Sequence, residues 1–242
     1  MFARAVLLVL SVLAAEQVYA GRWTRIRGGL KHVTASINYL WGVNKYDDIF
    51  ICTRPCNGGW RHIPGKLKQI DAGDTEVWGV NKHDHIFKRS ADGSGRWRHL
   101  NGRLKHVSAS GNGYIWGVNS NDDIFKCKKP CNGRWKHIPG KLKQIDGGYT
   151  YVYGVNSRDD IFTRRVDGSG GWRKISGKLK HITASGFDEV FGVNSAGNIY
   201  RCKKPCYGRW KMMSGKLQQC DATFDKLVGV NRYHHIFKRS LL

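Results

Sequence analysis

The residues of this chain that could bind a ligand cluster around a recurring tetrapeptide, aromatic–Gly–Val–Asn. In its first copy, Trp41 and Asn44 are followed by Asp48. Asn and Asp side chains can hydrogen-bond sugar hydroxyls, and an aromatic face can stack on a pyranose ring. We therefore predict sugar-binding residues at Trp41, Asn44, Asp48, Trp78, Asn81, Trp116, Asn119, Asp123, Tyr153, Asn156 and Asp160. The alternative is turn chemistry, because Asn and Asp at these offsets also cap β-turns without any ligand.

A second recurring group is basic and surrounds the Leu of a Gly–x–Leu motif, as Lys66 and Lys68 do. The whole chain has 41 Lys and Arg against 18 Asp and Glu, which gives a formal net charge of +23. Equivalent positions in successive repeats would place these cations in a ring, and such a ring attracts anionic polymers. We predict that anionic groups bind at Lys66, Lys68, Arg103, Lys105, Lys141, Lys143, Lys178 and Lys180. The alternative is a solvated basic face that keeps the protein soluble.

Signatures of catalysis and of metal binding are missing from the sequence. It contains no Gly–x–Ser–x–Gly, no His–Glu–x–x–His and no Walker loop. We therefore predict no enzyme, no catalytic residue, no metal site and no cofactor. His83 and His85 are expected at the surface, where the charge of a histidine rises below about pH 6.5. Acidic pairs such as Asp47 and Asp48 could suit calcium, but no other feature supports a calcium site.

Six of the seven cysteines lie in three closely spaced pairs, and the seventh stands alone. Cys–x–x–Pro–Cys occurs three times at a spacing of 75 residues, a pattern that favours disulfides in a secreted chain. We predict the disulfides Cys52–Cys56, Cys127–Cys131 and Cys202–Cys206. A metal site is the alternative, but six cysteines in different repeats cannot converge easily. Cys220 stands where other repeats have Ile or Val, so we expect a buried free thiol, with an intermolecular disulfide as the alternative.

The elements that position these residues are six repeats of 37 or 38 residues. The spacing is measured between the glycines of the tetrapeptide, which are Gly42, Gly79, Gly117, Gly154, Gly192 and Gly229. A repeat of this length has room for four short strands, and a propeller blade consists of four strands. The sequence therefore predicts an all-β, six-bladed β-propeller that occupies residues 21–242 as a single domain. A strand at Trp23 would complete the last blade and close the ring, whereas a linear solenoid would have no need for this split.

A Trp precedes each copy of the tetrapeptide, and we expect it to pack between blades rather than to contact a ligand. The tryptophans are Trp23, Trp60, Trp97, Trp135, Trp172 and Trp210.

Residues 1–20 have the pattern of a secretory signal peptide. Arg4 precedes an apolar run over residues 6–15, and the small residues Val18 and Ala20 fit a cleavage site before Gly21. The apolar run is too short to span a bilayer, which argues against the alternative of an uncleaved anchor. We expect a secreted, extracellular protein without a transmembrane segment.

The repeat pattern resembles that of the tectonin-repeat lectins, a family that includes horseshoe-crab tachylectins and fish-egg lectins. The resemblance rests on Trp–x–x–Ile, Gly–x–Leu–Lys, the aromatic–Gly–Val–Asn tetrapeptide and Ile–Phe–x–Arg, and it extends from Trp23 to about Arg239. It implies a non-catalytic innate-immune lectin, secreted or stored in granules, that binds lipopolysaccharide core sugars or N-acetylglucosamine and agglutinates bacteria. It also implies local disulfides in the three cysteine pairs and an unpaired Cys220.

Two other functions fit the same residues. The propeller could be a scaffold for protein partners, including other immune proteins, or a polyanion binder driven by its charge of +23. A scaffold would bind protein and ignore free sugar. A polyanion binder would show steep salt dependence without selectivity, and we expect no specific recognition of nucleic acid.

Overall fold

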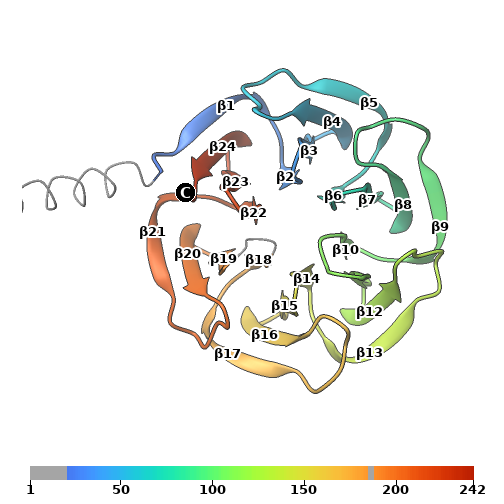
Figure 1. The fold of residues 1–242 in the computed structure, drawn as a ribbon, viewed down its shortest axis with the longest axis vertical. Helices are drawn as coiled ribbons and strands as arrows, with labels where there is room; N and C mark the ends of the chain where they lie inside the picture. The colour runs from blue at the N-terminus through green and yellow to red at the C-terminus, as the bar shows by residue number, and fades with distance from the viewer. Residues whose placement is uncertain (1–20, 185–187) are drawn as a thin grey trace, which may run out of the picture.

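The computed structural model describes residues 21–184 and 188–242, and these form a ring of six small antiparallel sheets (Figure 1). All elements of this part of the chain are β-strands. No helix in it is long and apolar enough to cross a membrane. The predicted signal peptide, residues 1–20, lies outside the described residues. The ring confirms the predicted six-bladed β-propeller.

The first five blades each consist of four consecutive strands. Blade 1 contains β2 (His32–Ala35), β3 (Tyr39–Val43), β4 (Asp48–Thr53) and β5 (Arg61–Lys66). Blade 2 contains β6 (Gln69–Ala72), β7 (Glu76–Val80), β8 (His85–Ser90) and β9 (Arg98–Arg103). Blade 3 contains β10 (His106–Ser108), β11 (Tyr114–Val118), β12 (Asp123–Lys128) and β13 (Lys136–Lys141). Blade 4 contains β14 (Gln144–Gly147), β15 (Tyr151–Val155), β16 (Asp160–Arg165) and β17 (Arg173–Lys178). Blade 5 contains β18 (His181–Thr183), β19 (Glu189–Val193), β20 (Asn198–Lys203) and β21 (Lys211–Lys216).

The sixth blade joins the two ends of the chain. It contains β22 (Gln219–Ala222), β23 (Lys226–Val230), β24 (His235–Ser240) and, as its outer strand, β1 (Thr24–Gly29). β1 pairs with β24 in antiparallel register, with Thr24 opposite Lys238 and Ile26 opposite Ile236. The predicted closure by an N-terminal strand is therefore confirmed, and it pairs the β24 edge that would otherwise be open.

The blades are fastened to one another by the recurring tryptophans. The indole nitrogen of Trp60 donates to the carbonyl oxygen of Arg27 at 2.8 Å, and that of Trp97 donates to Pro64 at 3.0 Å. The same bond recurs around the ring from Trp135, Trp172 and Trp210, and Trp23 closes the circle on Ser214. The expectation of packing between blades is confirmed.

The cysteine predictions also agree with the structure. Disulfides join Cys52 to Cys56, Cys127 to Cys131 and Cys202 to Cys206. Cys220 is a fully buried free thiol in the innermost strand of blade 6. Its position in the core is that of a small apolar side chain.

Strand direction separates the two ends of the ring. In blade 1, His32 lies opposite Val43 and Ala35 lies opposite Leu40. The β2–β3 turn therefore lies at one end of the blade, and the loop after Val43 lies at the other. We call the end with the turns between the first and second strands the turn face, and the opposite end the Asn-loop face. The other blades have the same pairing.

Candidate functional site

The predicted sugar-binding loops lie on the Asn-loop face, and their polar atoms are bonded to one another. Asn44 Oδ1 accepts hydrogen bonds from the backbone nitrogens of Tyr46 and Asp48, both at 2.9 Å. Asn44 Nδ2 donates to Asp48 Oδ2 at 3.0 Å. Equivalent bonds join Asn119 to Asp123 and Asn156 to Asp160, and Asn81 caps its own loop in the same way. The alternative of turn chemistry therefore describes these side chains.

The aromatic members of the predicted set require correction. Trp41, Trp78 and Trp116 are 0% exposed and Tyr153 is 1% exposed. They lie in the second strand of each blade, where four of five residues are buried. Their ring faces pack inside the protein and are not available to a sugar. The aromatic–Gly–Val–Asn tetrapeptide is a core strand followed by a capped turn.

The predicted basic ring also lies on the Asn-loop face, and carboxylates are interleaved with it. Lys66 and Lys141 pair with Asp48 and Asp123 of the same blades. The remaining pairs of this kind are Lys178–Asp160, Lys31–Asp47, Lys68–Asp84, Lys105–Asp122 and Lys143–Asp159. Bonds from the lysine and asparagine side chains lower the pKa of Asp48 and Asp123, so the carboxylates stay charged.

Two predicted cations differ from this pattern. Arg103 donates to the backbone carbonyl of His83 at 2.7 Å, since His85 stands where other blades have Asp48 or Asp123. In blade 5 the position equivalent to Asp159 is Gly197, which offers Lys180 no carboxylate. The basic charge of this face is thus partly compensated rather than presented as an open ring.

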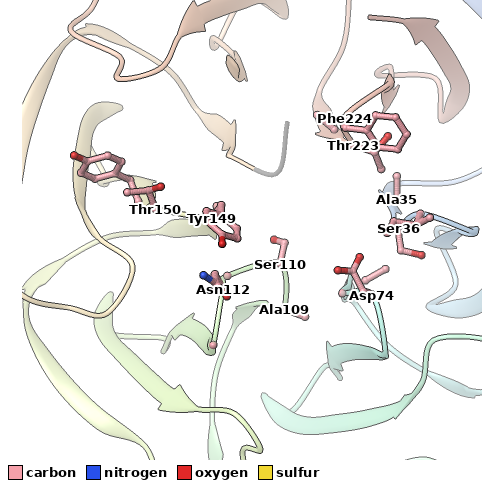
Figure 2. A pocket seen from close by; sticks show the side chains of 18 of the residues that line it. Ala35, Ser36, Asp74, Ala109, Ser110, Asn112, Tyr149, Thr150, Thr223 and Phe224 are labelled. Carbon is pink, nitrogen blue, oxygen red and sulfur yellow. The ribbon is translucent and has the colours of Figure 1, made fainter. Parts of the chain in front are cut away.

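An open cavity lies at the centre of the turn face, where the sequence analysis predicted no ligand-binding residue. It is a cavity of about 720 Å³ at the mouth of the central channel. Figure 2 shows Tyr149, Asp74, Ser36 and Phe224 around it. Tyr149 is 78% exposed and Phe224 is 53% exposed, so their rings face solvent. Aromatic faces beside hydroxyl and carboxylate groups form a surface that can bind a sugar.

Two lysines line the same cavity, and both follow a disulfide-bonded strand. Lys129 Nζ donates to the carbonyl oxygen of Ala109 at 2.8 Å, and Lys204 Nζ donates to that of Ala184 at 2.7 Å. Burial lowers the pKa of both lysines, to about 8 for Lys204. Nearby carboxylates partly oppose this effect in both lysines, and the pKa of about 8 leaves Lys204 mostly protonated at pH 7. The mouth therefore holds positive charge that an anionic group can meet.

Beneath the mouth, three buried carboxyl groups alternate with hydroxyl groups around the axis. Thr34 Oγ1 lies 2.9 Å from Asp71 and 2.8 Å from Asp221. Thr183 similarly bridges Asp146 and Asp221 at 3.0 and 2.8 Å. A hydroxyl has one proton to donate, so a second bond of Thr34 requires a proton on a carboxyl. In agreement, burial and neighbouring carboxylates raise the pKa of Asp71, and that of Asp146 to about 6.

The mouth escaped sequence reasoning because its residues do not repeat. The tips of the turns differ in every described blade, among them Ile37, Asp74, Asn112, Tyr149 and Phe224. The available signal was this lack of repetition, since identical blades need no variation to pack. A site on the axis collects one different residue from each blade.

Comparison with known proteins places the chain among repeat propellers. A family model described as Tectonin domain matches residues 8–92 and 66–241. Lectin L6 from Tachypleus tridentatus is 59% identical over 38 residues, which are 16% of this chain and 17% of that protein. The match thus spans about a sixth of the length of this curated relative.

Solved structures with the same arrangement are distant in sequence. The structure of U3-55K has a TM-score of 0.70 at 7% identity, covering 90% of this chain and 98% of that one. Human WBSCR16 has a TM-score of 0.60 at 8% identity, covering 88% and 76%. YCF48 bound to D1 peptide has a TM-score of 0.57 at 16% identity, covering 88% and 77%. At these identities the similarity shows the propeller fold alone.

Proposed function

Because the chain belongs to the Tectonin domain family, we propose that it is a secreted lectin without catalytic activity that binds glycans of bacterial surfaces, lipopolysaccharide among them. The lectin assignment is supported by the match to Lectin L6. Secretion is supported by three disulfides and by the leader pattern of residues 1–20. Lipopolysaccharide core sugars carry phosphate and carboxylate groups, which suit a chain with a net charge of +23.

The observation that carries the proposal is the mouth on the turn face. It places the exposed ring of Tyr149 in one cavity with the ammonium groups of Lys129 and Lys204. A sugar ring can stack on the tyrosine while a phosphate or carboxylate meets the lysines. The volume of about 720 Å³ lies within the range of small-ligand sites.

Agglutination requires one lectin molecule to attach to two bacteria at once, so the molecule needs a second attachment point. The Asn-loop face is our proposal for it, because it carries the predicted cations. Its ion pairs leave it less selective than the mouth, so we propose that it contacts anionic groups by charge. Two opposed faces would let one molecule link two surfaces through several weak contacts.

The first prediction separates the two faces by matched variants. Tyr149→Ala removes an exposed ring from the mouth, and Tyr46→Ala removes one from the opposite face. We expect Tyr149→Ala to weaken binding of a lipopolysaccharide core oligosaccharide about 2- to 10-fold, the value of one aromatic contact. Tyr46→Ala should leave the affinity unchanged. Isothermal titration calorimetry on the mature protein measures both.

The opposite pattern would be weakened binding of the oligosaccharide by Tyr46→Ala and normal binding by Tyr149→Ala. It would place the sugar site on the Asn-loop face. Repetition at high ionic strength tests the polyanion alternative. Binding that disappears with added salt and ignores free sugar would show that charge alone is recognised.

A further inference from the structure

Three histidines meet on the axis of the propeller, one from every second blade. They are the first residues of β2, β10 and β18, which lie innermost in the ring (Figure 1). The centroids of the His32, His106 and His181 rings are 6.2 to 6.4 Å apart, so the rings form a nearly equilateral triangle. Each ring offers one nitrogen to a set whose members all lie within 4.8 Å of one another.

The alternate blades have glutamine at the same level, and each glutamine is satisfied. Gln69 accepts from the backbone nitrogen of Val107 at 3.0 Å and donates to its carbonyl oxygen at 2.9 Å. Gln144 and Gln219 make the same pair of bonds to Ile182 and Val33. At this position, the glutamine side chain therefore forms hydrogen bonds with the backbone of an adjacent blade.

The histidines leave buried nitrogen atoms without partners. Both ring nitrogens of His32 and the Nδ1 atoms of His106 and His181 are buried and make no hydrogen bond. Leaving such a group unsatisfied costs about 1–3 kcal/mol. Three equivalent positions carry this energetic cost, although glutamine at the same position of the other blades forms hydrogen bonds and avoids it. The arrangement is explained if the nitrogens serve a ligand.

The space between the rings fits a single ion. The void on the axis measures about 10 Å³, which is close to the room that one water-sized sphere occupies. Imidazole nitrogen is a common metal ligand in proteins. The carboxyl groups of Asp71, Asp146 and Asp221 line the same void, so oxygen atoms as well as imidazole nitrogens face it.

We propose that His32, His106 and His181 form a site for one Zn²⁺ ion in the central channel. Three imidazoles with a fourth position open to water are an established zinc arrangement. Because the nitrogens lie within 4.8 Å of one another, Zn–N bonds of about 2.0–2.1 Å require each nitrogen to move by up to about 0.8 Å toward the axis. The ion would join blades 1, 3 and 5, so it would brace the ring from within. This role does not depend on the sugar site at the mouth.

The test compares the chelator-treated mature protein with variants that carry the residue of the neighbouring blades. His32→Gln, His106→Gln and His181→Gln each remove one ligand, and His83→Gln removes an exposed histidine outside the channel. Titration with ZnCl₂ should show one tight site per chain and a rise in Tm. Each channel variant should weaken that site at least about 10- to 100-fold, the effect of losing even an outer partner of a ligand. His83→Gln should leave it unchanged.

Unchanged tight binding in the channel variants, or its loss in His83→Gln, would overturn the proposal. Co²⁺ gives a second readout that needs no variant. Intense visible absorption, displaced by one equivalent of Zn²⁺, is expected from a tetrahedral nitrogen site. Weak absorption typical of hydrated octahedral Co²⁺ would contradict it, and so would equal competition by Ca²⁺, which prefers oxygen ligands.

Discussion

Lys204 holds its proton less firmly than an exposed lysine, and the cause is local. Lys204 is half-buried beside the mouth, and Asp146 and Asp188 only partly offset the loss of solvation. The pKa of about 8 lies near physiological pH. A depressed lysine pKa means that the positive charge is present below that value and is lost as pH rises through it. Recognition of an anionic sugar should therefore be sensitive to mild alkali.

We predict that affinity for a phosphorylated core oligosaccharide falls as pH rises from 7 to 9, by about 10-fold, the value of a hydrogen bond to a charged group. Lys204→Arg should abolish this pH dependence, because arginine stays charged. Lys204→Met should bind weakly at all pH values. Calorimetric titrations across the pH range measure the effect. A wild-type affinity independent of pH would show that Lys204 does not contact the anion.

Single residues were the part of the site that the sequence could least predict. Repetition drew attention to Trp41 and Asn44, which recur because they build a strand and a turn. Tyr149 is matched by an aromatic residue at Phe224 but by Ile37 and Asp74 in blades 1 and 2, so its position does not repeat from blade to blade. The histidines escaped because they alternate with glutamine, at about twice the repeat length. Residues that repeat in every blade are those that the blade needs to fold. The candidate ligand-binding residues are instead those that differ between blades.

At the scale of the element, the outer strand of each blade depends on a glycine. Gly65 has a φ of +123°, and an added Cβ would lie 3.2 Å from the indole nitrogen of Trp97. The glycine thus permits both the backbone bend and the bond from Trp97 to Pro64. The pattern of strands, tryptophans and disulfides was predictable from sequence because each of them recurs in register.

Gly65→Ala should destabilise the protein by about 1–3 kcal/mol, because it combines an unfavourable φ with a close contact. For a domain of this size each 1 kcal/mol lowers Tm by about 2–4 °C. Gly59→Ala is the matched control, since a Cβ there would meet nothing within 4 Å. Thermal unfolding followed by circular dichroism distinguishes the two. Equal Tm values for both variants would mean that the Trp97 contact does not constrain the strand.

The whole molecule is held closed by the pairing of β1 with β24. Every other blade takes its outer strand from its own repeat, so blade 6 alone depends on both ends of the described chain. An open β24 would present unpaired backbone groups and a template for association. A Cβ at Gly21 would clash with the carbonyl oxygen of Ser240, so the two ends are already adjacent. We therefore expect closure to require the strand itself and not its place before blade 1 in the chain.

This argument predicts different outcomes for two rearranged chains. Deletion of residues 21–29 should lower the unfolding midpoint and promote aggregation, because it removes β1 and also the hydrogen bond from Trp23 to Ser214. A circular permutant that begins at Leu30 and joins residue 242 to residue 21 through a short Gly/Ser linker should unfold at nearly the wild-type midpoint. Denaturant titration and light scattering compare the chains. A stable, monomeric deletion variant would show that five complete blades and a three-stranded sixth hold the ring without closure, and a permutant as unstable as the deletion would show that chain order matters as well.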